Sequence, residues 1–544
     1  MADDSAPPAA QRPAPPRGAH GGRDLTQGRI APTLLAFALP TLGSSILQSL
    51  NGSINAVWVG RFLGEDALAA TSNANIVMFL LMAFVFGFGM ASTILIGQAF
   101  GRRDVDQARR VLGTAMGGFI LVAAAIGVAG WIWAPNLLKL LATPAGAAPL
   151  ALAYLRVIFI AIPSSLVLIM LMMAMRGAGD AMTPLWFMIL AVILDSGLNP
   201  VLILGLGPAP KLGIAGSATA TVIANYVSLA ALLVYLYARD LPLRLRGREL
   251  AYLRPDPAIL RTIVVKGLPM GLQMIVISAS ALALVGLVNR EGVATTAAFG
   301  VAMQLWTYLQ MPAMALGAAV SAMAAQNIGA GKWDRVSAVT RSGIAFALAI
   351  TAGLVVLLAL ADRPALALFL GGHSPALPIA RHIQILATWS FLMFGVTLVL
   401  FGTVRANGSV IGPLVILFVG LVPVRLGFAL GAYPWLKADA LWISFPVSSF
   451  SNMALAIAFY LHGGWRKSRM QIGGAPPTAP SRRARRSASR KRSRTPNRAD
   501  GSTRRGEPQG GDRCAHVPPV QRYSVVSARF DLYTVLVWRS CSSM

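Results

Sequence analysis

The sequence is poor in charge, in acid and in cysteine. Only 12% of the 544 residues are charged, whereas about a quarter are charged in an ordinary soluble domain. Acidic residues number 20, and the two cysteines, Cys514 and Cys541, lie near the C-terminus. Hydrophobic residues make up 56%, and the mean hydropathy is +0.64. Such a surface cannot mostly face water, which excludes a soluble enzyme, a secreted disulfide scaffold and a transcription factor.

Several chemical signatures are also missing. The sequence has no Gly-Lys-Ser/Thr loop for nucleotide phosphates, which excludes a built-in ATPase. It has no His/Cys cluster with the spacing of a catalytic metal site, and no paired carboxylates within an apolar segment. We therefore expect neither an enzymatic activity nor a cofactor, and any transport would have to be driven by a gradient of H⁺ or Na⁺.

Twelve apolar segments set the expected fold class. Each is about long enough to cross a bilayer of ~30 Å. They lie at 32–58, 67–98, 112–134, 150–174, 184–206, 213–237, 263–288, 298–325, 342–360, 381–404, 412–433 and 439–462. The pattern predicts an all-α integral membrane protein with twelve transmembrane helices.

The two halves of the apolar region resemble each other. An offset of 228–229 residues superimposes Leu-Pro pairs, a Gln/Gly/Asp set and an Arg/Gly/Pro set: Leu39, Pro40, Gln98, Gly101, Asp106, Arg176, Gly179 and Pro184 match Leu268, Pro269, Gln326, Gly329, Asp334, Arg405, Gly408 and Pro413. Two six-helix lobes in the same orientation imply a pseudo-two-fold axis along the membrane normal. Such halves commonly enclose a substrate site near mid-membrane, which indicates a transporter.

The expected organisation has five parts. These are a disordered cytoplasmic N-terminus (1–30), an N-lobe (31–238), a cytoplasmic linker (239–262), a C-lobe (263–465) and a basic disordered tail (466–544). Alternate loops, starting with the second, carry sixteen Lys/Arg, and the opposite loops and segment ends carry eight. The positive-inside rule therefore predicts a multi-pass protein of the plasma (inner) membrane with both termini in the cytoplasm.

The tail differs in composition from the rest of the chain. It is rich in Arg, Ser, Pro and Gly and holds 18 of the 47 Lys/Arg residues. We favour functionally inert disorder, including the case of GC-rich sequence read in an unintended frame. A basic patch against anionic lipid or nucleic acid is the alternative.

Asp195 is the one acidic residue deep within an apolar segment. Asn199 lies four residues later, on the same helical face, and Pro200 removes a backbone donor and is expected to kink the helix. An ionisable group in a bilayer is costly unless it is paired or hydrated. We interpret Asp195 and Asn199 as a site for a proton or small cation, with a structural carboxylate as the alternative.

Other polar and adaptable side chains are candidates for a substrate chamber. Gln48, Asn51 and Asn55 form a stripe on the first segment, which must face protein or a water-filled cavity. Interhelical hydrogen bonding explains this stripe equally well. The remaining chamber candidates are Met173, from a methionine cluster, Trp306 and the embedded Arg425. Core packing, interfacial anchoring and structural pairing, respectively, are the alternatives for these three.

The loop motifs carry a family resemblance. They are VGRFLGEDALAA, GQAFGRRDVDQARR with its echo AQNIGAGKWDR, RGAGDAMTP with its echo RANGSVIGP, LNPVLILG, GIAGSATAT and PVRLGF. In this order, over about 31–465, they resemble the multidrug and toxic compound extrusion (MATE) family. The resemblance implies two six-helix bundles arranged in a V that export amphiphilic, often cationic compounds in exchange for H⁺ or Na⁺.

The resemblance also implies a cation site. The familiar N-lobe site would map onto Asn55, Asp195, Asn199 and Thr221, with Asp and Asn exchanged relative to the Asn-x-x-x-Asp-Pro pattern of some members. Acidic residues that other members use in the C-lobe would fall near Ile277 and Phe394, where this chain has none.

The single N-lobe carboxylate favours H⁺ over Na⁺, so we expect a proton-coupled antiporter working by alternating access. The alternatives are a Na⁺-coupled exporter and a lipid-linked oligosaccharide flippase of the same superfamily. The expected partners are a small amphiphilic substrate and membrane lipid, with no nucleic acid for the membrane body. We expect a monomer.

Overall fold

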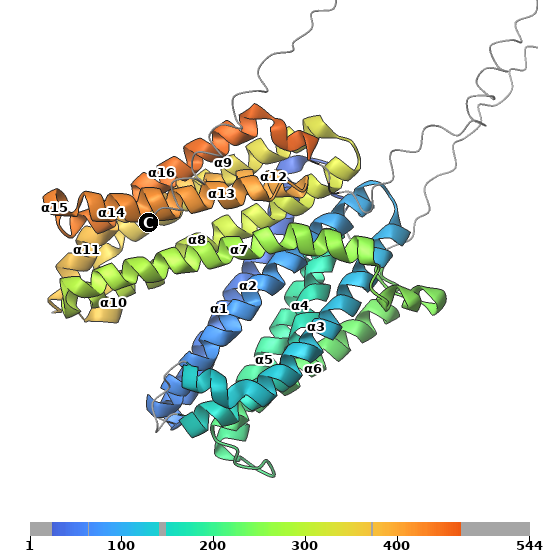
Figure 1. Ribbon diagram of the computed structural model, residues 1–544, viewed down its shortest axis with the longest axis horizontal. Coiled ribbons are helices and arrows are strands. Elements are labelled where there is room, and N and C mark those ends of the chain that lie inside the picture. The colour runs from blue at the N-terminus through green and yellow to red at the C-terminus, as the bar shows by residue number, and fades with distance from the viewer. Residues whose placement is uncertain (1–23, 64, 141–147, 372–373, 469, 471–544) are drawn as a thin grey trace, which may run out of the picture. The chain divides into compact units, whose positions relative to one another are not determined.

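The computed structural model describes residues 24–63, 65–140, 148–371, 374–468 and 470, with side chains left out for 65–82 and 140. Within these ranges all regular secondary structure is helical, and twelve stretches are long and apolar enough to span a membrane (Figure 1). The predicted fold class is therefore confirmed. Disorder was predicted for 1–30 and 466–544, and most of both segments (1–23, 469 and 471–544) lies outside the described ranges. The described ends of these segments are ordered instead, because Leu25 and Met470 are buried and Arg466 lies in a 3₁₀ turn at Gly464–Lys467.

The first six long helices pack against one another and form what we call the N bundle. They are α1 (Ile30–Leu63), α2 (Glu65–Gly101), α3 (Val105–Leu140), α4 (Ala148–Gly177), α5 (Met182–Leu204) and α6 (Ile214–Ala238). Apolar side chains of α4 are buried along most of its length, because α4 packs on α2, α3 and α6. Helix α5 runs on through Pro200 to Leu204.

The later helices form the C bundle. They are α7 (Pro257–Val288), α8 (Val293–Gly329), α9 (Trp333–Leu360), α10 (Asp362–Leu370), α11 (Ala376–Ala387), α12 (Phe391–Ala406), α13 (Ile411–Val419), α14 (Gly427–Gly431), α15 (Tyr433–Leu436) and α16 (Asp439–His462). Two predicted segments are interrupted. A short 3₁₀ turn at Thr388–Ser390 separates α11 from α12, and a π-helical stretch at Gly420–Leu426 contains Pro423, which lacks a backbone donor.

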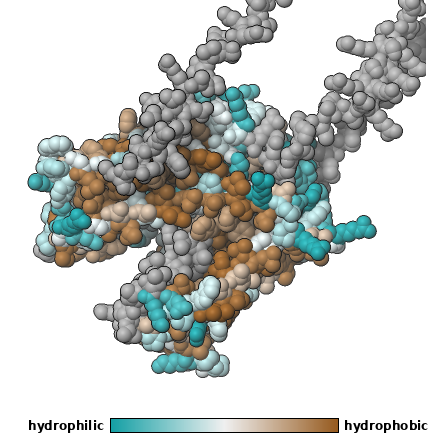
Figure 2. Space-filling model, viewed as in Figure 1, coloured by the Kyte–Doolittle hydropathy of each residue, from teal (hydrophilic) through white to brown (hydrophobic). Residues whose placement is uncertain are grey.

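The outer faces of both bundles are apolar. Large hydrophobic side chains such as Leu121, Trp133, Ile193, Leu282 and Leu360 are more than half exposed. In Figure 2 hydrophobic colour covers much of the visible flank of each bundle, while hydrophilic residues gather toward the helix ends. A surface of this kind matches lipid tails along the flank and water at the two ends.

The two bundles are packed together where α2 crosses α7 and α8 (Figure 1). A side chain at Gly101 would collide with the backbone carbonyl of Gln326, and a side chain at Gly329 with that of Gln98. Gly87 lies against the backbone of Gly267 in the same way. The Gly101–Gln326 and Gly329–Gln98 contacts are reciprocal under the sequence repeat. We call the end of the bundles that carries Gly101 and Gly329 the closed end.

Buried glutamines connect the bundles at the closed end. Gln98 Nε2 donates to the carbonyl of Ala406 at 2.7 Å, and Gln326 Nε2 donates to the carbonyl of Gly177 at 3.1 Å. The N-terminal segment joins the same network, because the Leu25 backbone N–H donates to Gln326 Oε1 at 3.1 Å and Leu25 is fully buried. A buried amide that loses such a partner is left unsatisfied, so separation of the bundles here needs new partners for these groups.

Gly101→Ala is predicted to force α2 and α8 apart. The added methyl group meets a backbone carbonyl, which no change of rotamer can move away. We expect a loss of about 1–3 kcal/mol in stability, as in other overpacked sites, or a longer distance between spin labels placed on α2 and α8 near the closed end. Gly353→Ala is the control, because a side chain there meets no atom within 4 Å. Unchanged stability and unchanged label distances in Gly101→Ala would contradict the prediction.

Candidate functional site

Asp195 lies at the centre of a buried polar cluster in the N bundle. Its Oδ2 accepts hydrogen bonds from Asn51 Nδ2 at 2.9 Å and from Asn55 Nδ2 at 3.0 Å. Its Oδ1 accepts from Thr221 Oγ1 at 2.9 Å and from Asn199 Nδ2 at 3.4 Å. Helices α1, α5 and α6 thus meet on a single carboxylate.

The cluster is shielded from solvent and closed on itself. Asp195 is 2% exposed and Asn199 is fully buried. Asn199 Nδ2 also donates to Asn55 Oδ1 at 2.6 Å and to the backbone carbonyl of Asp195 at 2.9 Å. The spacing of four residues that the sequence analysis noted therefore does place Asp195 and Asn199 together, one helical turn apart on α5.

Hydrogen bonds, and no cation, balance the carboxylate. Asp195 forms no ion pair with any other described residue. The buried oxygens Asn51 Oδ1 and Asn199 Oδ1 have no hydrogen-bond partner. Across the described ranges, no three His, Cys, Asp or Glu side chains come together as a metal site. The cluster is thus suited to an acid that gains and loses a proton.

One face of α1 continues from the Asp195 cluster to a cavity of about 360 Å³. Thr41, Ser44, Ser45 and Gln48 of α1 line the cavity, and Asn51 follows one turn later on the same face. The cavity lies between the bundles, because its walls come from α1, α2, α4 and α5 on one side and α7, α8 and α12 on the other. Its remaining lining residues are Phe37, Ala83, Val85, Phe86, Met90, Thr93, Ile169, Met172, Met173, Arg176, Met188, Met274, Met314, Ala315, Gly317, Ala318, Ala322, Leu398, Gly402 and Arg405.

The structure distributes the predicted chamber residues among different places. Gln48 and Met173 line the cavity. Asn51, which we had assigned to the chamber, instead donates to Asp195. Trp306 lies in the core of the C bundle, 1% exposed, where its Nε1 donates to Gln384 Oε1 at 3.0 Å and to Thr388 Oγ1 at 2.9 Å. Sequence alone does not show which face of a buried helix looks toward a neighbour and which toward a cavity.

Arg425 also lies away from the lining of the cavity. It sits on the π-helical stretch of the C bundle, and its guanidinium carbon is 3.8 Å from the centroid of the Phe445 ring. Arg425 and Asp195 are not in contact in the structure. A cation over an aromatic face is stabilised by the ring quadrupole.

Arg176 and Arg405 are charged cavity residues that the sequence did not single out as candidates. They stand in the last turns of α4 and α12, at matching positions of the repeat, and each precedes a glycine with positive φ: Gly179 (95°) and Gly408 (85°). In the sequence both arginines lie at the junction of an apolar segment and a loop, and they contribute to the positive charge of the alternate loops. The sequence repeat could have identified them, because Arg176 and Arg405 occupy equivalent positions in the two halves. Residues at equivalent helix ends in two symmetric lobes are expected to face the space between the lobes in the same way.

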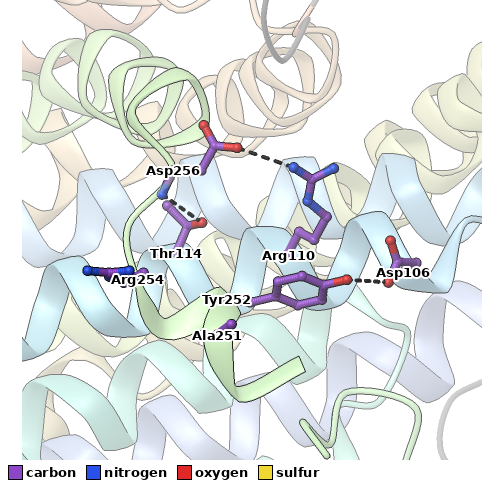
Figure 3. Close-up of a pocket in the computed structure, with 7 residues that line it drawn as sticks. All are labelled: Asp106, Arg110, Thr114, Ala251, Tyr252, Arg254 and Asp256. Atoms are coloured by element: carbon purple, nitrogen blue, oxygen red, sulfur yellow. Dashed lines mark hydrogen bonds and ion pairs between the residues drawn. The ribbon is translucent and has the colours of Figure 1, made fainter. Parts of the chain in front are cut away.

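A second pocket lies where the linker covers α3 (Figure 3). Tyr252, in the 3₁₀ segment Gly247–Leu253, donates to Asp106 Oδ1 at 2.8 Å, and Arg110 lies 3.4 Å from Asp256. The hydrogen bond to Asp106 raises the pKa of the Tyr252 hydroxyl. These contacts attach the linker to the N bundle, and Gly117 on α3 leaves room for the backbone of Leu253.

Trp306→Phe is predicted to destabilise the protein without changing which ligands the cavity binds. The substitution leaves Gln384 and Thr388 without their indole donor in a buried core, which costs about 1–3 kcal/mol. We expect a lower Tm and an unchanged profile of ligands bound by the purified protein. Trp186→Phe serves as the control, because Trp186 is 62% exposed. An altered profile at wild-type stability would instead make Trp306 a chamber residue.

Comparison with known proteins adds independent evidence. The MatE family model matches residues 40–201 and 269–430, two stretches that begin 229 residues apart. The chain is 36% identical over 436 residues to the probable multidrug resistance protein YoeA of Bacillus subtilis, covering 80% of this chain and 94% of that protein. It is 27% identical to the probable multidrug resistance protein YpnP of the same organism, covering 82% and 98%.

A solved structure agrees in fold. The outward-facing conformation of a multidrug resistance MATE family transporter of the MOP superfamily superimposes with a TM-score of 0.74 at 20% identity, covering 83% of this chain and 98% of that one. Its similarity supports the twelve-helix, two-bundle architecture. The two family matches, the YoeA relative and the shared fold lead to one conclusion: this multi-pass membrane protein belongs to the multidrug and toxic compound extrusion (MATE) family.

Proposed function

We propose that the protein is a proton-coupled antiporter that exports amphiphilic small molecules across the plasma membrane by alternating access. The main support for this proposal is the Asp195 cluster, in which one buried carboxylate on α5 is hydrogen-bonded to side chains of α1 and α6. The names of the Bacillus relatives support drug-like substrates.

The donor pattern around Asp195 favours a proton over a sodium ion. Asn51, Asn55 and Asn199 all direct N–H groups at the carboxylate. A sodium ion needs several oxygen ligands, as hard cations do in general, and here the amides would first have to turn round. A proton needs only one oxygen of Asp195.

Protonation of Asp195 changes the requirements of its neighbours. A protonated carboxyl oxygen becomes a donor, so an amide N–H facing it must move away. The unpartnered oxygen of Asn51 can then accept from Asp195 if the amide turns. Because Asn51 and Asn55 belong to α1, which also lines the cavity, the proton changes the helix face that substrate contacts.

The reverse follows from linkage: a substrate that favours one arrangement of α1 changes the proton affinity of Asp195 by the same factor.

The basic residues of the closed end support its assignment to the cytoplasm. Arg102, Arg103, Lys332 and Arg335 lie beside the crossing of α2 and α8. Lys332 Nζ donates to the Thr26 carbonyl at 2.9 Å, and Arg335 to the Gln27 carbonyl at 2.8 Å. By the positive-inside rule this end faces the cytoplasm. On this assignment the state is closed to the inside, and the described chain begins and ends on the cytoplasmic side.

Asp195→Asn is predicted to abolish substrate-driven proton movement while the protein still folds. The amide is close to the carboxylate in size but cannot bind a proton in the working pH range. Purified protein is placed in vesicles that contain a pH-sensitive dye, and substrate is added outside. Ethidium and an anionic amphiphile, 1-pyrenebutyrate, are both used, so that the charge of the substrate does not decide the result. Wild type should release protons from the vesicles, and Asp195→Asn should not.

Asp334→Asn is the matched control, because Asp334 is an exposed carboxylate at the start of α9. Proton movement by Asp195→Asn at the wild-type rate would overturn the proposal. Transport that requires Na⁺ and releases no protons would replace H⁺ by Na⁺ as the coupling ion.

A further inference from the structure

Among the described residues that line the cavity, two arginines are the only charged side chains. Arg176 ends α4 in the N bundle and Arg405 ends α12 in the C bundle, so each bundle contributes one. Among the 24 described residues that line the cavity, none is acidic. The described part of the cavity wall therefore carries two positive charges and no negative charge.

The hydrogen-bonding capacity of these arginines is largely unused. Arg176 makes no hydrogen bond or ion pair with any described residue, and its Nε is buried. Arg405 donates one Nη2 bond to Gln273 Oε1, and its Nε is likewise buried without a partner. A buried guanidinium with free donors is costly, and an oxyanion is the ligand that matches its planar array of donors.

The rest of the cavity suits an apolar body. Met90, Met172, Met173, Met188, Met274 and Met314 all line it. Thioether side chains adapt to apolar ligands of different shape. Basic groups at the closed end and methionines around them together match a molecule with an apolar part and an anionic end.

We propose that Arg176 and Arg405 form an anion-binding site that takes the oxyacid group (carboxylate, sulfonate or phosphate) of an amphiphilic ligand in the cavity. Binding at this site is independent of any proton movement, and its role in export rests on the proposed antiport function. The proposal reverses the cationic charge that the family resemblance led us to expect for the substrate.

The position of the site connects it to the contact between bundles. Arg176 directly precedes Gly177, whose carbonyl accepts from Gln326, and Arg405 directly precedes Ala406, whose carbonyl accepts from Gln98. A ligand held by both arginines therefore binds next to both interbundle hydrogen bonds. Its arrival or departure acts on the residues that keep the closed end closed.

The test is a comparison of two probes that differ in charge. 1-Pyrenebutyrate and 4-(1-pyrenyl)butylamine share the same ring and chain but end in a carboxylate and an ammonium. Their binding to the full-length protein in phosphatidylcholine nanodiscs is measured by energy transfer from tryptophan to pyrene, without any ion gradient. Empty nanodiscs correct for partition into lipid.

We expect the carboxylate probe to bind more tightly than the amine. Arg176→Gln and Arg405→Gln should each weaken carboxylate binding about tenfold, as loss of a charge-assisted hydrogen bond does. Arg425→Gln is the matched control and should leave binding unchanged, because Arg425 does not line the cavity. Tighter binding of the amine, or equal carboxylate binding in wild type and both Arg→Gln variants, would overturn the proposal.

A second pair of variants covers the case in which the glutamine variants fail to fold. Arg176→Lys and Arg405→Lys keep the positive charge, so they should still bind the carboxylate probe more tightly than the amine. Loss of that preference would overturn the site.

Asp195→Asn separates this proposal from the antiport proposal, and it should bind the carboxylate probe. If it does so but moves no protons, both proposals stand. If it moves protons normally while the arginine variants lose binding, only the antiport proposal fails.

Adding phosphatidylglycerol to the nanodiscs identifies the source of the anion. Displacement of the carboxylate probe would support the site with a lipid headgroup as its natural occupant. Retention of the probe would support the site with a free amphiphile as the ligand.

Discussion

A single buried carboxylate without a cationic partner constrains the whole N bundle. An ionised group in apolar surroundings is tolerated only when donors surround it, and here those donors come from three helices. Asn51 and Asn55 hold α1, Thr221 holds α6, and Asn199 closes the set on α5. Two residues of the polar stripe on α1, Asn51 and Asn55, donate to Asp195, and the third, Gln48, lines the cavity. Three helices of the N bundle are thereby held together around one carboxylate.

The second constraint is the close approach of backbones at the closed end. At the crossing of α2 and α8, Gly101 lies against the backbone of Gln326, and Gly329 lies against the backbone of Gln98. The side chains of Gln98 and Gln326 each donate a hydrogen bond to a backbone carbonyl of the opposite bundle. These contacts follow the sequence repeat, so the two lobes meet symmetrically. The Asp195 cluster has no counterpart of this kind, since Arg425 lies near the equivalent place in the C bundle, over Phe445. The two lobes are thus symmetric at the closed end and differ at the level of Asp195, which lies in the N bundle.

Much of this arrangement was open to prediction, and some of it was not. Hydropathy alone revealed twelve spans, because the bilayer imposes length and composition on each. The partnership of Asp195 with Asn199 followed from helical spacing. The contact of Thr221 with Asp195 could be predicted only from the family resemblance, because the sequence pattern of α6 does not show which side chain of α5 it faces. Asn51, Trp306 and Arg176 show the limit: their positions depend on the rotation of whole helices, which side chains far along the chain determine.

The absence of acid among the described residues of the cavity wall has an electrical consequence. When a proton enters in exchange for a departing monocation, no net charge crosses the membrane. When it enters in exchange for a departing monoanion, two elementary charges move inward in each cycle. Each charge contributes about 2.3 kcal/mol at a potential of 100 mV, so the voltage adds to the pH gradient as a driving force. Under the two proposals made above, proton antiport and an anionic substrate, transport would therefore generate a current, and a membrane potential alone would sustain export after the pH difference has been dissipated.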